Sequence, residues 1–249
     1  MFILDFSFDT KYDTVRYMTT EPFISAHQDP EGESPWALQC VVNEATEFSE
    51  NALSQATALA VLNFLDEAKT NPEWATAVER WKQGRIRKIL RRARNAKWDK
   101  LANEAGVTTE HNGISVRVFV PSAMDSIPSN IKKCQVSGIT ATENEYLSST
   151  NELPALAIFS NRSLNMSPGK AAVACAHVAQ LMSEQLQEED YAAWKALGFP
   201  LWASTLGEVN PWVESFADVV IHDGGLTEVE PGSITAIGIW NTRAEEEIL

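Results

Sequence analysis

Residues 155–187 read ALAIFSNRSLNMSPGKAAVACAHVAQLMSEQLQ. The short apolar run at 155–159 predicts a strand. Ser167 and Pro168 then supply an N-cap and a first helical residue for a helix that extends to about Gln187. A strand that leads directly into a long alanine-rich helix is typical of α/β folds.

The same half of the chain continues with alternating short elements. We expect a short helix around 191–197, a strand at 201–205, a helix near 208–216, and two strands at 219–223 and 234–240. Along strand 219–223, Asp223 points to the opposite side from His222, so the two residues are not expected to be partners.

The first half shows the same order of elements. It predicts a strand at 36–43, a helix at about 50–69, a shorter helix from Asn71 through Trp81, and a strand at 114–120. When the halves are aligned, residues 58–62 fall on 177–181, and Asn51 falls opposite Lys170. We therefore infer a tandem duplication of an α/β unit with a mixed four-stranded sheet and packed helices. The first copy is interpreted as degenerate and the second as functional.

The domain boundaries follow from this repeat. Residues 1–34 form an N-terminal extension, 35–140 the degenerate unit, 141–152 a linker, and 153–249 the functional unit. The linker lies within a longer stretch, 121–153, which is rich in Ser, Thr, Asn and Pro and shows no sustained period.

Residues 80–100 concentrate half of the positive charge of the chain. They hold ten of its twenty Lys and Arg residues and one acid, so the segment has a net charge of +9. The whole chain has a net charge of −14, so the other residues together carry −23. A solvated helix face is one interpretation. Such density, with tryptophans interleaved, favours nucleic-acid contact instead. The candidate contacts are Arg87, Arg91, Arg92 and Arg94.

The secondary structure of this basic segment has two interpretations. Residue propensities favour a continuous helix through Arg94. The repeat instead makes 85–90 a strand, equivalent to 201–205, followed by a helix from about Asn95. We favour the strand.

Two stretches of the second half carry candidate chemistry. Residues 166–177 place Lys170 in the first turn of a helix, with His177 about two turns further along the same face. Residues 219–235 place Asp223 where a strand ends, followed by two glycines and Thr227. A lysine beside free helix amides suits an anion, and a carboxylate at a strand end suits a general base. A helix start and a strand end can meet over the edge of an α/β sheet, so we expect Lys170, Asp223 and Thr227 to line one cleft, with the carboxylate within reach of Lys170. For each residue a structural role is the alternative: a core histidine, a turn-bracing aspartate, an exposed lysine.

These stretches resemble the signature motifs of the second class of peptidyl-tRNA hydrolases, found mainly in archaea and eukaryotes. The chain looks like a longer, two-unit, bacterial-type variant of this second class. The first motif, Met-Gly-x-Gly-Lys-x-Ala-x-Gln-x-x-His-Ala, is matched at Gly169, Lys170 and His177. The second, Asp-Ala-Gly-Arg-Thr-x-Ile-x-Pro-Gly-Ser-x-Thr, is matched at Asp223, Gly225, Thr227, Pro231, Gly232, Ser233 and Thr235. Ala174, Gly224 and Leu226 differ from the pattern.

The resemblance implies hydrolysis of the ester that joins a peptide to tRNA. Asp223 would then orient and deprotonate water, Lys170 would stabilise charge, and Thr227 would bind Asp223 or the substrate. The first unit would be catalytically empty. The alternative, favoured by Ala174 and Leu226, is an RNA-binding or scaffold protein that keeps the fold without the activity.

Other features of the sequence limit the cellular location and the binding partners that we expect. Three widely spaced cysteines argue against a disulfide framework, the N-terminus lacks a secretory signal, and no apolar run suits a membrane helix. We expect a cytoplasmic protein with tRNA as its partner and with no cofactor, metal, membrane or obligate protein partner. It would act as a pseudo-dimeric monomer or as a homodimer.

Overall fold

The computed structural model describes residues 29–142 and 153–241. The expected N-terminal extension and linker fall almost entirely outside these residues. In the first unit the elements are β1 (Trp36–Asn43), α1 (Glu50–Ala68), α2 (Pro72–Lys82), β2 (Arg87–Ala93), α3 (Ala96–Asp99), η1 (Lys100–Asn103), β3 (Gly106–His111), β4 (Ile114–Phe119), β5 (Ser122–Ala123) and α4 (Ser129–Lys132). In the second unit they are β6 (Ala155–Asn161), η2 (Arg162–Leu164), α5 (Pro168–Gln185), α6 (Glu188–Ala196), β7 (Leu201–Leu206), α7 (Pro211–Glu214), β8 (Val219–His222) and β9 (Ile234–Asn241).

The two units have the same sheet topology. The first sheet has the order β2-β1-β4-β3, with β5 added beside β1, and the second has the order β7-β6-β9-β8. In each sheet the first strand pairs in parallel with the strand after the two helices, and the remaining main-path pairs are antiparallel. The expectation of two mixed α/β units is confirmed, and the repeated order is consistent with a tandem arrangement.

The basic segment contains a strand, as the repeat predicted. β2 pairs with β1 from Arg87 to Ala93, and α3 begins shortly afterwards at Ala96. The helix propensity of Arg, Lys and Leu is overridden because seven residues gain a parallel partner strand. This result places the basic residues along the edge of the first sheet.

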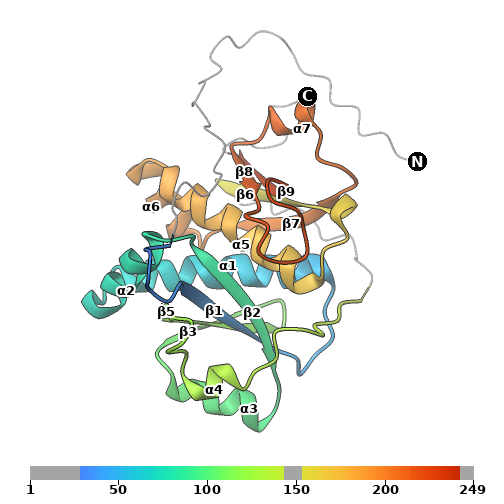
Figure 1. The fold of residues 1–249 in the computed structure, drawn as a ribbon. Coiled ribbons are helices and arrows are strands. Elements are labelled where there is room, and N and C mark those ends of the chain that lie inside the picture. The colour runs from blue at the N-terminus through green and yellow to red at the C-terminus, as the bar shows by residue number, and fades with distance from the viewer. Residues whose placement is uncertain (1–28, 143–152, 242–249) are drawn as a thin grey trace.

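Helices α1 and α5 pack against each other and form the layer between the two sheets (Figure 1). Each helix has small buried residues on more than one side, so both sheets can approach it. α5 contributes Ala172 and Ala176 to the core of the first sheet. In return, α1 contributes Ala58, Leu59 and Leu62 to the core of the second sheet.

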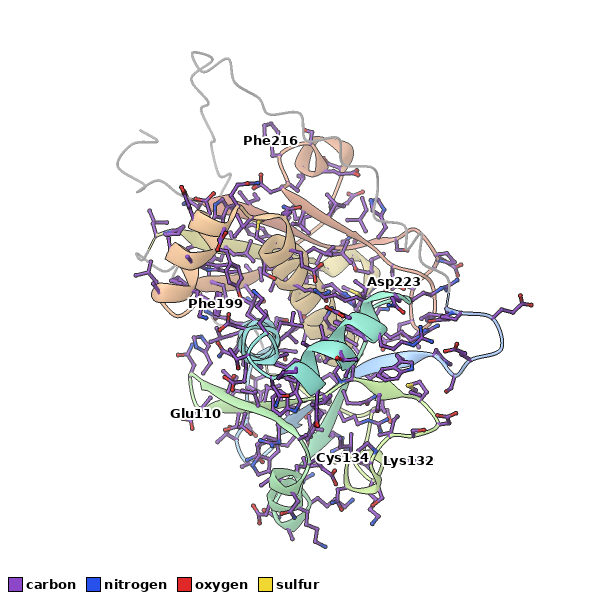
Figure 2. All side chains as sticks on the ribbon, turned by 90° about the vertical axis from the view of Figure 1, so that its left-hand side faces the viewer. Glu110, Lys132, Cys134, Phe199, Phe216 and Asp223 are labelled. Atoms are coloured by element: carbon purple, nitrogen blue, oxygen red, sulfur yellow. The ribbon has the colours of Figure 1, made fainter. Side chains whose placement is uncertain are left out.

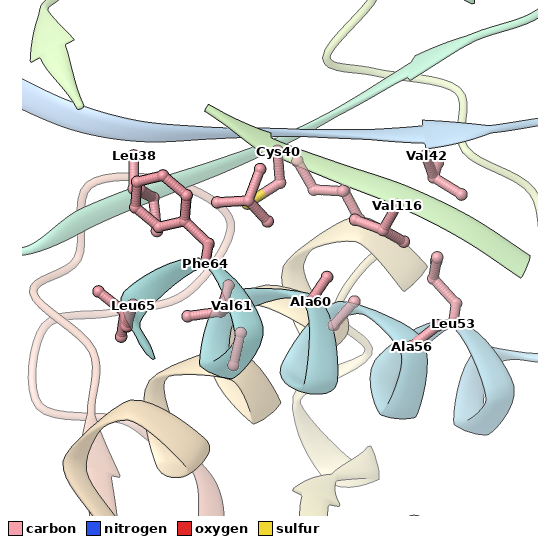
Figure 3. Close-up of a cluster of buried hydrophobic side chains, with 14 of the residues drawn as sticks. Leu38, Cys40, Val42, Leu53, Ala56, Ala60, Val61, Phe64, Leu65 and Val116 are labelled. Carbon is pink, nitrogen blue, oxygen red and sulfur yellow. The ribbon is translucent and has the colours of Figure 1, made fainter. Parts of the chain in front are cut away.

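Figure 3 shows how α1 packs on its own sheet. Apolar side chains on this face of the helix, among them Leu53, Ala60 and Phe64, point toward Cys40 and Val116 of the strands. Burying this face stabilises the helix more than local propensity does.

Residues 121–142 are not the linker that their composition suggests. They include β5 and α4, and Ile127, Ile131 and Cys134 join a buried cluster with Phe119. Strand β3 was also not predicted from the sequence, and α7 is shorter than the helix expected near 208–216. In β3 and α4 a single residue is buried, Thr109 and Ile131 respectively, so the apolar periodicity that would identify these elements in the sequence is weak. Within residues 29–142 and 153–241, no helix has the length and hydropathy needed to span a bilayer.

Candidate functional site

A cleft of about 450 Å³ lies between the edge strand β2, helix α5 and the loop from β8 to β9. All three elements contribute polar and charged groups to it. Of the expected site residues, those that line it are Lys170, His177, Asp223, Thr227, Arg87 and Arg91. The cleft therefore joins the second unit's motifs to the first unit's basic strand.

Lys170 and Asp223 form an ion pair in the cleft. The Lys170 Nζ donates to Asp223 Oδ2, and the two side chains remain 13% and 16% exposed. The sequence places a cation in the first helical turn, where the helix dipole disfavours it. The carboxylate of Asp223 provides the compensating negative charge.

The start of α5 positions Lys170. Ser167 caps the helix by accepting a hydrogen bond from the Lys170 N–H at 3.3 Å, and Pro168 is its first residue. Glu228, from the β8–β9 loop, in turn accepts hydrogen bonds from the Ser167 N–H and hydroxyl at 2.8 and 2.9 Å. The helix start and the loop are thus held together at the cleft.

The loop itself is closed around Asp223. The main chain of Asp223 donates to Ser233 O at 2.9 Å and accepts from the Gly232 N–H at 2.8 Å, while Oδ1 accepts from the Gly225 N–H at 2.8 Å. Gly225 has φ +68°, and a Cβ there would lie 2.4 Å from Pro231 Cγ. Only glycine fits, because the backbone is left-handed and the proline ring is adjacent.

Thr227 and Leu226 stand at the exposed rim of the cleft. Both side chains are exposed, Leu226 to 52%. Among the described residues, the Thr227 hydroxyl makes no hydrogen bond to Asp223, whose oxygens accept from Lys170 and Gly225 instead. Of the two expected roles for Thr227, contact with a substrate remains.

His177 shares the cleft with Lys170, and Ala174 lies on the same face between them. The His177 Nδ1 lies 2.8 Å from the Nζ of Lys88, a residue of β2. Burial, together with the positive charges of Lys88 and Lys170, holds the pKa of His177 well below its usual value. His177 is therefore neutral at physiological pH.

The four arginines expected to contact RNA occupy different environments. Arg87 and Arg91 line the cleft; Arg87 pairs with Asp29 at 2.6 Å, and Arg91 is 7% exposed and donates to Gln39 and to the carbonyl of Cys134. Arg92 pairs with Glu44 at 2.9 Å and donates to Ser137 O, whereas Arg94 is exposed. The four therefore do not form one exposed surface, because Arg91 is buried and Arg92 is paired with Glu44.

Two cleft residues that the candidate set omitted come from the same basic segment. Arg85 lines the cleft and brings its Nη1 within 4.0 Å of the Cβ position of Gly224, across from β2. Lys88 is 7% exposed and contacts His177 and Gln180. Strand alternation would have placed Lys88 on the same face as Ile86 and Leu90, but which helix covers that face depends on the tertiary fold.

The first unit lacks an equivalent site. Helices α1 and α5 both begin after a capping serine, and the third residue after the cap is Ala52 in the first unit and Lys170 in the second. Ala52, rather than the expected Asn51, is thus the counterpart of Lys170. Between β3 and β4 there is only the short turn at Asn112 and Gly113 in place of the loop that carries Asp223.

Within the described ranges, no cluster of three or more His, Cys, Asp or Glu side chains could hold a metal ion. A scan of this sequence against models of known protein families finds no match.

Proposed function

We propose that the protein hydrolyses the ester bond of peptidyl-tRNA or of N-blocked aminoacyl-tRNA. The observation that carries this proposal is the Lys170–Asp223 ion pair in an open cleft. Both residues belong to the motifs that resemble those of the second class of peptidyl-tRNA hydrolases, and Thr227 of the same motif stands at the rim.

In this proposal Asp223 activates the attacking water molecule. A carboxylate offers about four lone-pair sites, and the Lys170 ammonium and the Gly225 N–H each take one. The remaining sites can accept a proton from a water molecule in the cleft. An activated acyl ester needs less assistance than an amide, so one oriented carboxylate with an adjacent cation is adequate chemistry.

The basic strand is proposed to hold the RNA. β2 forms one wall of the cleft, so a phosphate backbone bound along its edge would pass close to Lys170. Arg85, within the cleft, and the exposed Arg94 are the positions best placed for contact, and Arg87 contributes where it is released from Asp29. Phosphate contacts of this kind supply affinity without reading sequence.

Asp223→Asn is the decisive substitution for hydrolysis. The amide keeps the size and the hydrogen bond from Gly225 but cannot accept the proton, so the rate should fall about 10²–10⁴-fold. The measurement is deacylation of N-acetyl-aminoacyl-tRNA, with folding checked by circular dichroism. Asp99→Asn, on the exposed face of α3, removes the same charge as a control and should retain full activity.

A second candidate function is tRNA binding without turnover. It is favoured by Ala174 and Leu226, which place apolar side chains in the cleft where the resembled family has Gln and Arg. This candidate would be supported if the wild type binds tRNA tightly without deacylating it, and if Asp223→Asn leaves the affinity for tRNA unchanged.

A further inference from the structure

Lys88 is a buried lysine that the first unit extends into the cleft of the second. It is 7% exposed, lines the cleft, and lies over the ring of Trp81 with Nζ 5.1 Å from the ring centroid. Its ammonium contacts Gln180 Oε1 and lies 2.8 Å from His177 Nδ1. These are acceptors without formal charge, whereas a buried lysine ordinarily has a carboxylate partner.

The surrounding network determines how these partners are oriented. Glu184 pairs with Lys82 at 2.5 Å and accepts from Gln180 Nε2 at 3.0 Å. The amide of Gln180 therefore has its Nε2 toward Glu184 and its Oε1 toward Lys88. Gln180 and Lys88 are thus held in one arrangement, with the lysine as the donor.

This arrangement also selects the tautomer of His177. While Lys88 is charged, its ammonium group has three donors and no acceptor. The Nδ1 of His177 must then offer its lone pair to Lys88, and the ring proton must be on Nε2. Among the described residues Nε2 has no hydrogen-bond partner, and it is not among the buried side-chain atoms left without one. Because His177 lines the cleft, its Nε2–H is available to a ligand there.

We propose that Lys88 is a positioning residue, supplied by the catalytically empty unit, that holds His177 as the neutral Nε2–H tautomer. This N–H donates a hydrogen bond to an oxygen acceptor of the acyl ester bound beside Lys170 and Asp223. The substrate part of this inference rests on the proposed function. His177 is then a hydrogen-bond donor and not a general base, because the nitrogen that faces the cleft carries the proton.

The tautomer can be measured without any assay of activity. In protein labelled with ¹⁵N-histidine, long-range nitrogen–proton correlations distinguish protonated from unprotonated ring nitrogens. The spectra are recorded below about pH 7, where Lys88 is charged. We expect an unprotonated Nδ1 and a protonated Nε2 for His177, assigned by the signals that His177→Gln removes. A wild-type spectrum with the proton on Nδ1, or with a charged ring near neutral pH, would overturn the proposal.

The substitution Lys88→Met tests whether Lys88 determines the tautomer of His177. It retains the length of the stem and removes the charge and the donors, so the His177 spectrum should become a mixture of tautomers. The pKa of His177 should also rise toward its ordinary value. Lys132→Met removes the same charge from an exposed site on α4, distant from Asp223 in Figure 2, and should leave the His177 spectrum unchanged.

The consequence for hydrolysis is tested by a double-mutant cycle. Lys88→Met should lower kcat about tenfold, whereas the same change in a His177→Gln background should have little further effect, because an amide N–H needs no tautomer selection. Equal losses of kcat in both backgrounds would show that Lys88 acts only through packing, which would contradict the proposal. If the wild type does not deacylate tRNA at all, the proposed function fails, while the spectra still decide the tautomer.

Discussion

At the scale of single residues, Lys88 links folding to protonation. Burial lowers its pKa from 10.5 to about 7, with the negative charge of Glu184 opposing the shift. Below about pH 7 both the folded and the unfolded chain hold the proton. Between about 7 and 10.5 only the unfolded chain holds it, so the free energy of unfolding rises with pH across this window.

The measurement is urea unfolding of the wild type and of Lys88→Met from about pH 7.5 to about pH 9. Relative to the variant, the wild type should gain roughly 1.4 kcal/mol per pH unit. Cys40 and Cys175, whose pKa values burial raises to about 12, act in the opposite direction above their ordinary pKa. Both proteins retain these cysteines, so their effect cancels. Parallel pH profiles would mean that Lys88 of the folded protein keeps its proton throughout this range, which contradicts a lowered pKa.

At the scale of elements, the repeat provides two equivalent helix starts with different surroundings. Ser49 caps α1 by accepting from the Ala52 N–H at 3.2 Å, and Ser167 caps α5 by accepting from the Lys170 N–H. Only Ser167 also binds Glu228 of the loop that carries Asp223. Substituting each capping serine in turn therefore distinguishes an effect on helix stability from an effect on the geometry of the site.

Ser49→Ala and Ser167→Ala should each lower the free energy of unfolding by about 0.5–2 kcal/mol, because each leaves a helix amide uncapped. Only Ser167→Ala should also reduce deacylation, by about tenfold, because the loop loses one of its attachments to α5. Thermal unfolding and initial rates on the same preparations measure the two effects. A matching loss of activity in Ser49→Ala would show that stability alone controls the rate.

At the scale of the whole molecule, the two units share one layer of helices. Ala172 and Ala176 are fully buried in the core of the first sheet although they belong to the second unit. Without the first unit, this face of α5 would form an exposed apolar patch of the kind that drives association or unfolding. The units are therefore covalently linked but not structurally independent.

A fragment of residues 143–249 is accordingly expected not to be a folded monomer. Light scattering and NMR dispersion should show self-association or an unfolded chain, and co-expression with residues 1–142 should restore a one-to-one complex. A well-dispersed monomeric spectrum from the fragment alone would contradict this prediction.

Much of the fold is set by local sequence. Ser167 and Pro168 favour a helix start because they suit the N-cap and the first helical position, and the alanine-rich run continues the helix. The apolar runs of β1 and β6 are predicted as strands from their own residues alone. The pairing of Lys170 with Asp223 was expected on the same basis. A helix start and a strand end tend to meet at one edge of an α/β sheet.

Only the tertiary structure decided which groups the charged side chains of the basic segment contact. Arg91 turns inward to Gln39 and the main chain, while Lys88 crosses to His177 of the other unit. The two side chains have different partners because strand alternation places them on opposite faces of β2, and only one of these faces packs against α5. Partners distant in sequence carry no local pattern, so the packing of the two units, and not the composition of the segment, assigned these roles.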